Sequence, residues 1–91
     1  MKLDIRETEK EIKKTEAELN ELEAKAKTLF ERAKRIFDTL RNDELTLTDI
    51  EAEEDQLKET LNEIQETATE IINSRLFLEF KNEELELLEY L

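Results

Sequence analysis

The sequence contains no cysteine, histidine, glycine, proline or tryptophan, and these absences exclude several kinds of structure and function. Without cysteine there is no disulfide framework and no thiolate metal site. Without cysteine and histidine, the usual nucleophile–base pairs and most transition-metal ligands are missing. Without glycine there is no glycine-rich loop to bind phosphate. We therefore expect neither an enzyme nor a protein that holds a metal or another cofactor.

Long apolar runs are absent too, since no stretch approaches the ~20 apolar residues of a membrane span. Alternating charges, not an apolar segment of the signal-peptide kind, follow the first residue. We expect no membrane contact and a cytoplasmic location. Charged residues make up 44% of the chain, which is a level found in disordered proteins. The lack of glycine and proline, with abundant Glu, Lys, Leu and Ala, instead favours long helices.

A heptad repeat runs through the first half of the chain. Its positions follow alternating steps of three and four, which is the sequence signature of a coiled coil. They are Ile5, Thr8, Ile12, Thr15, Leu19, Leu22, Ala26, Leu29, Ala33, Ile36 and Leu40. The repeat predicts a first helix over about 4–41.

The repeat stops at residues 42–47, where Asn, Asp and Thr favour a turn. Thr48 and Glu51 fit a capping box, in which each side chain binds the other residue's backbone amide. Acidic residues crowd the positions that follow, where they suit the positive end of a helix dipole. We predict a turn at 42–47 and a second helix over about 48–91.

The second helix has a matching repeat if the chain folds back on itself. Antiparallel pairing about residue 45 places residues opposite each other when their numbers add to 90. The predicted inner positions are Ile50, Glu54, Leu57, Leu61, Ile64, Ala68, Ile71, Arg75, Leu78, Asn82, Leu85 and Glu89. This register matches eight apolar pairs, so the predicted fold class is all-α, an antiparallel two-helix coiled-coil hairpin in a single domain.

Residues 73–82 are the weakest part of the second helix. Asn73 and Ser74 are poor helix formers, and Asn82 could begin a short third helix at the C-terminus. A strand in this segment would have no partner in so helical a chain. The sequence therefore favours a continuous helix over a break at 73–82.

Several large apolar residues have no place in the predicted inner row. An exposed apolar patch normally marks an interaction surface. A bend or a third helix could cover them within one chain, but self-association is the sharper hypothesis. It predicts a homodimer in which two antiparallel hairpins form a four-helix bundle. The predicted interface comprises Phe30, Phe37, Ile72, Leu76, Phe77, Phe80, Leu87 and Leu88.

The negative charge is concentrated in the second half of the chain. Residues 1–45 carry 11 basic and 12 acidic residues, a net charge of −1, whereas residues 46–91 carry 3 and 14, a net charge of −11. Six carboxylates at steps of three or four form an acidic stripe: Glu51, Asp55, Glu59, Glu63, Glu66 and Glu70. The stripe is interpreted either as a solvated face or as a docking site for a basic protein surface.

Two function classes remain open. The leading hypothesis is a non-enzymatic protein–protein interaction module, an oligomerising coiled-coil adaptor or scaffold. The alternative is an acidic inhibitor that mimics nucleic-acid phosphates and so blocks a nucleic-acid-binding protein. In general type, a small acidic helical chain is similar to accessory and inhibitor proteins of bacterial viruses. Direct binding of nucleic acid is not expected, because a net charge of −12 repels phosphate.

Overall fold

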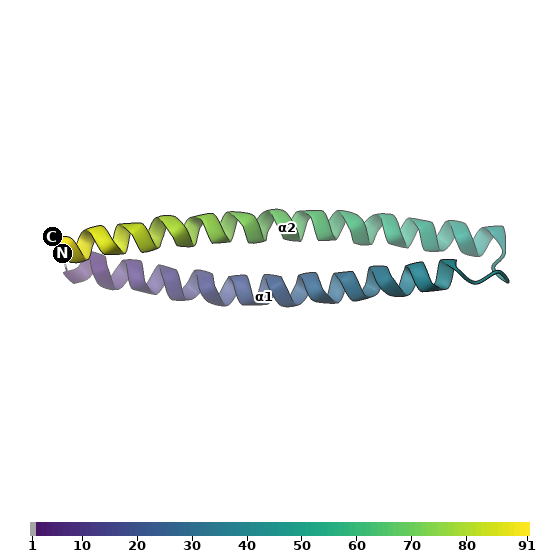
Figure 1. The fold of residues 1–91 in the computed structure, drawn as a ribbon, viewed down its shortest axis with the longest axis horizontal. Coiled ribbons are helices and arrows are strands. Elements are labelled where there is room, and N and C mark those ends of the chain that lie inside the picture. The colour runs from purple at the N-terminus through teal and green to yellow at the C-terminus, as the bar shows by residue number, and fades with distance from the viewer. Residues whose placement is uncertain (1) are drawn as a thin grey trace. The chain divides into compact units, whose positions relative to one another are not determined.

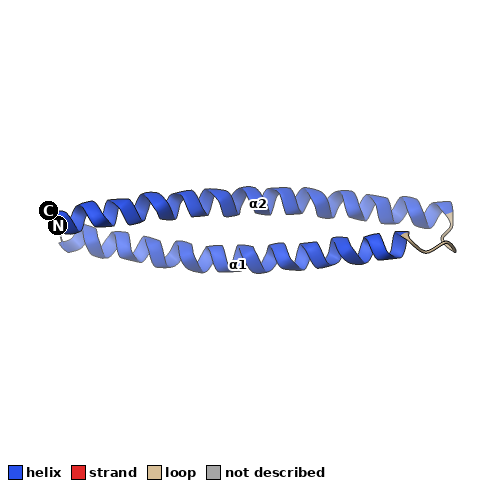
Figure 2. Ribbon diagram, viewed as in Figure 1, coloured by secondary structure: helices blue, strands red, loops and turns tan. Residues whose placement is uncertain are grey.

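The chain forms two long helices that pack against each other, and the prediction of an all-α helical hairpin is confirmed. The computed structural model describes residues 2–91, with side chains from residue 4 onward. Helix α1 spans Lys2–Leu40 (39 residues) and helix α2 spans Leu47–Tyr90 (44 residues), and the described residues contain no strand (Figures 1 and 2).

The hairpin divides into two compact units, each made from both helices. Unit 1 comprises Met1–Glu23 and Thr69–Leu91, and unit 2 comprises Ala24–Ala68. Unit 1 therefore pairs the beginning of α1 with the end of α2. Unit 2 contains the end of α1, the turn and the beginning of α2.

The turn uses local side-chain hydrogen bonds and needs no left-handed residue. The Glu44 amide donates to the Asn42 side-chain oxygen at 3.1 Å, as in an Asx turn. A capping box then begins α2, but it joins Thr46 and Asp49 and not the predicted Thr48 and Glu51. The Asp49 amide donates to the Thr46 hydroxyl at 3.2 Å, and the Thr46 amide donates to the Asp49 carboxylate at 3.3 Å. The helix consequently begins one residue earlier than predicted, at Leu47.

The heptad repeat of α1 predicts its inner face correctly. All eleven predicted positions are buried or half-buried. The apolar side chains that are fully buried in the described part of the chain all belong to this row: Ile12, Leu29, Ala33 and Ile36. Thr8 and Thr15 are buried with them. The core of this protein is thus small and lies mainly along one helix.

Helix α2 is rotated relative to the prediction. Six of the twelve predicted inner positions are half-buried: Ile50, Leu57, Ile64, Ile71, Leu78 and Leu85. At each of the other six, the inner residue is the one that immediately precedes the predicted residue. The inner row contains Glu53, Thr60, Thr67, Ser74, Lys81 and Leu88, whereas Glu54, Leu61, Ala68, Arg75, Asn82 and Glu89 are exposed. The pairing of individual residues across the hairpin stays a prediction, except that Leu61 and Ala68 are not inner residues.

Burial of two threonines explains how this rotation is tolerated. Thr60 and Thr67 are each only 1% exposed. The Thr60 hydroxyl donates to the Gln56 carbonyl at 2.8 Å, and the Thr67 hydroxyl donates to the Glu63 carbonyl at 2.7 Å. Because each hydroxyl is satisfied within its own helix, burying it carries little desolvation cost, and the side-chain methyl group packs inward.

No break occurs at 73–82, and no third helix forms at the C-terminus, since α2 is continuous to Tyr90. The favoured interpretation of this segment is therefore confirmed. The inner face of α2 passes through Ser74 and Lys81, so this part of the helix packs against α1 with polar residues in the row.

Candidate interaction surfaces

One side of unit 2 is polar. The Arg32 guanidinium and the Glu63 carboxylate lie 3.5 Å apart, and both side chains are about half exposed. Each residue immediately precedes an inner position, Ala33 in α1 and Ile64 in α2. A half-exposed ion pair contributes little to stability. Its value here is geometric, because it shows that residues preceding inner positions share one side of the hairpin.

The opposite side of unit 2 carries exposed large apolar residues. Phe30, Phe37 and Leu61 each immediately follow an inner position. In unit 1, Glu23 and Arg75 also follow inner positions, and their side chains form an ion pair at 3.2 Å. This ion pair shows that residues that immediately follow inner positions of the two helices lie on the same side of the antiparallel helix pair. We call Phe30, Phe37 and Leu61 the unit-2 apolar face; they are 60%, 48% and 48% exposed.

Among the residues of unit 1 whose side chains the structure describes, the exposed large apolar ones lie on α2 or just after its end. Phe77, Phe80 and Leu87 each precede an inner position and form what we call the unit-1 apolar row. The α1 residues that precede inner positions in this unit include Glu11 and Glu18, so the row is apolar on one helix only. Further exposed apolar residues in this unit are Ile72, Leu76 and Tyr90 of α2 and Leu91 after its end.

A lysine occupies an inner position beside this row. The Lys81 ammonium lies 2.7 Å from the Glu11 carboxylate and 3.0 Å from the Glu84 carboxylate, and 5.5 Å from the centre of the Phe77 ring. The hydrogen bond to Glu11 raises the pKa of Lys81 above its ordinary value, and Glu84 acts in the same direction. The lysine thus links the two helices of unit 1 in its protonated form.

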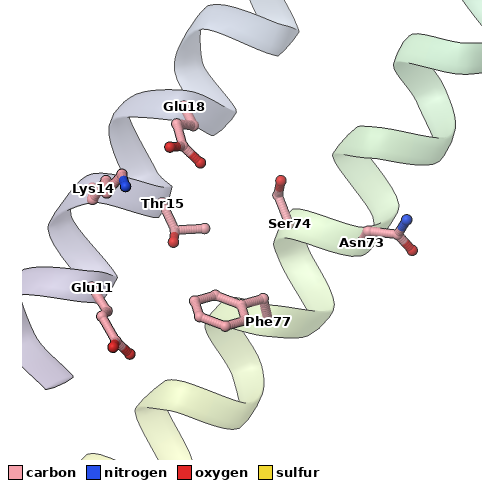
Figure 3. A pocket seen from close by; sticks show the side chains of 7 residues that line it. All are labelled: Glu11, Lys14, Thr15, Glu18, Asn73, Ser74 and Phe77. Carbon is pink, nitrogen blue, oxygen red and sulfur yellow. The ribbon is translucent and has the colours of Figure 1, made fainter.

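A pocket of about 420 Å³ opens between the helices of unit 1. It forms where two small polar residues, Thr15 and Ser74, occupy the inner rows of the two helices. Figure 3 shows the Phe77 ring turned toward α1 and the Ser74 side chain pointing into the gap. Glu11, Lys14, Glu18 and Asn73 complete the lining. The inner surface of unit 1 is therefore partly polar and incompletely filled.

The acidic stripe does not behave as one surface. Glu51, Asp55, Glu59 and Glu66 are exposed, and Glu63 is held by Arg32. Glu70, also exposed, belongs to unit 1, whereas the other five members belong to unit 2. The carboxylates of α2 in unit 2 therefore give this segment a strong negative charge. The Glu63 carboxylate is the one that is neutralised within the hairpin, by Arg32.

The predicted interface residues divide into two groups. The exposed group, as predicted for interface residues, comprises Phe30, Phe37, Ile72, Leu76, Phe77, Phe80 and Leu87. Leu88 is half-buried on the inner face of α2, because the rotation of this helix turns it toward α1. Leu61 was missed, since the same rotation turns it outward. The buried Thr60 before Leu61 carries no apolar signal that could have revealed this.

Comparison of the chain with protein-family models, curated proteins and solved structures gives no match. Neither described helix combines the length and the apolar character that crossing a membrane requires.

Titration of Lys81 should make stability fall at high pH. Because the folded-state pKa lies above the ordinary value, the stabilisation is complete below the ordinary pKa and is lost as the pH rises through the folded-state value. Urea unfolding between about pH 9 and about pH 11.5 should show this decline. Lys81→Met should flatten the profile. Lys14→Met is the matched control, because Lys14 is an exposed lysine of the same unit, and it should leave the decline in place.

Proposed function

We propose that this chain is a non-enzymatic protein–protein interaction module, an oligomerising coiled-coil adaptor or scaffold. The observation that carries the proposal is the exposure of large apolar side chains on both units, from 40% at Phe77 to 69% at Phe80 among the phenylalanines. Apolar surface of this extent on a helix pair is typical of docking through apolar anchors. The fully buried apolar residues, by contrast, number only four in the described part of the chain.

Capture experiments test this function. The immobilised chain should retain a protein partner at both ~50 mM and ~500 mM salt, because apolar contacts are not screened by ions. Replacing Phe80 and Leu87 by Gln removes the two most exposed residues of the unit-1 apolar row and should abolish capture of a partner that docks there. The matched control exchanges Glu79 and Glu86, exposed residues of the same segment, for Gln. This control variant should still capture the partner. Capture that survives loss of the apolar residues on both units would contradict the adaptor function.

The acidic inhibitor is the second candidate function. It is supported by the exposure of Asp55, Glu59 and Glu66 on an α2 segment that carries one basic residue, Lys58, between positions 47 and 68. Exchanging these three acids for their amides should abolish capture of a basic partner, and capture of the unchanged chain should weaken steeply between the two salt concentrations. Glu63 is best left intact, because its loss would also break the contact with Arg32.

A further inference from the structure

We infer that the unit-2 apolar face binds a second copy of this chain, with α1 of each copy lying over α2 of the other and both turns at the same end. This inference rests on the proposed interaction function and names the partner of one of its surfaces. It differs from the sequence-based hypothesis of an antiparallel dimer, in which the apolar residues of one unit would cover those of the other.

The surface area of the chain supports a partner of substantial size. The chain exposes 7492 Å². A folded monomer of this mass, 10.9 kDa, is expected to expose about 5,600 Å². The excess of roughly 1,900 Å² is larger than the ~800 Å² that each partner buries in a standard stable interface. Pairing of two copies would therefore bury surface that a single hairpin leaves in water.

The three residues of the unit-2 apolar face lie on one side and are supplied by both helices. Phe30 and Phe37 come from α1, Leu61 comes from α2, and the Arg32–Glu63 ion pair marks the opposite side. A two-helix surface of this kind can stack on an identical surface to give four antiparallel helices around a shared core. Two phenylalanines near the centre supply the aromatic anchors that dominate such interfaces.

Charge decides how the two copies are oriented. Among the residues that follow inner positions, and so lie on this side of unit 2, α1 supplies two basic residues, Lys27 and Lys34, a net charge of +2. On the same side α2 supplies two acidic residues and one basic residue, Glu51, Glu54 and Lys58, a net charge of −1. If α1 lay over α1 of the partner, like charges would face each other across the interface on both sides. If α1 lies over α2 of the partner, each positive helix has negative neighbours and each negative helix has positive ones.

Sedimentation equilibrium on the full chain tests the partner and the face. We expect a dimer at ~100 μM, and a dissociation constant raised at least about tenfold by Phe30→Gln with Phe37→Gln. The matched control is Thr28→Gln with Thr39→Gln, which places the same side chains at exposed sites elsewhere on α1 and should leave the constant unchanged. A monomeric wild-type chain would overturn the inference. A dissociation constant that stays unchanged when both phenylalanines are replaced would overturn it too.

A second measurement tests the orientation without altering the face, in case the glutamine variant fails to fold. Asp43 is exposed in the turn, and the chain has no cysteine, so Asp43→Cys allows one spin label per copy. Turns at the same end should lie about one helix spacing apart, roughly 10 Å. Copies oriented oppositely would separate the turns by about 30 Å, from the 1.5 Å rise of a helix over some 20 residues. Dipolar broadening supports the proposed arrangement, and a separation of about 30 Å or more overturns it.

The outcomes distinguish this inference from the proposed function. A wild-type chain that stays monomeric, yet still captures another protein through its apolar residues, would overturn only the self-association. A chain that neither dimerises nor captures a partner through those residues would contradict both.

Discussion

Leu29→Ala is expected to lower the free energy of unfolding by about 2–4 kcal/mol, the range for truncating a fully buried leucine. Leu29 is 2% exposed and lies in unit 2 among the few buried apolar side chains of α1. Its removal leaves a cavity in a row that holds few other buried apolar side chains. Because small proteins have only about 5–15 kcal/mol of stability in total, the loss is a large fraction.

Urea unfolding at one fixed protein concentration measures this effect, because association would make the apparent stability depend on concentration. Leu47→Ala makes the same truncation at a residue that is 73% exposed, and it should cost less than about 0.5 kcal/mol. Equal losses for the two variants would show that Leu29 is not buried in solution.

The second large effect is expected from Thr67→Asp. Thr67 is 1% exposed, so an aspartate there must either be buried without a partner or be protonated, and both options cost free energy. We expect a loss of about 3 kcal/mol or more. Ala68→Asp introduces the same charge at the next residue, which is exposed, and should be tolerated within about 1 kcal/mol.

This pair of variants also tests the rotation of α2. The sequence pattern places Ala68 in the inner row, whereas the structure places Thr67 there. If Ala68→Asp proved the more damaging change, the inner face of α2 would be the one that the heptad pattern predicts.

The sequence predicts α1 better than α2 for a physical reason. In α1, apolar residues or threonines fill both alternating positions of the repeat, so only one face can turn inward. In α2, either of two neighbouring rows could accompany Leu57, Ile64 and Ile71. The row predicted from Leu61 and Ala68 would also turn inward two glutamates and an arginine, Glu54, Glu89 and Arg75.

The observed row of α2 avoids much of that desolvation cost. It contains one glutamate, Glu53, where the predicted row has two. Its other polar members are the hydroxyl residues Thr60, Thr67 and Ser74 and a lysine that has two carboxylate partners. Apolarity alone ranks leucine above threonine at an inner position. The hydrogen bond from a threonine hydroxyl to its own helix, and the charge pairs across the hairpin, depend on tertiary structure and cannot be read from the repeat.

The same limit applies to the interaction surfaces. The sequence alone identifies the exposed phenylalanines as candidate interface residues, because none of them occupies a predicted inner position of α1 or α2. The inclusion of Leu61 and the loss of Leu88 both depend on the rotation of α2. The division of unit 2 into a polar and an apolar side follows from that rotation and from the Arg32–Glu63 contact, which spacing along one helix does not reveal.

The capped turn has a consequence for the order in which the chain folds. Within unit 2, no two residues are more than 44 positions apart (68 minus 24), and the turn is formed by local hydrogen bonds. In unit 1, residues paired across the helices are at least 46 positions apart (69 minus 23). Closing a short loop costs less entropy than closing a long one. Folding should therefore start at the turn, and the two helices should then pair progressively away from it. The polar inner row of unit 1, with Thr15, Ser74 and Lys81, should form last and unfold first.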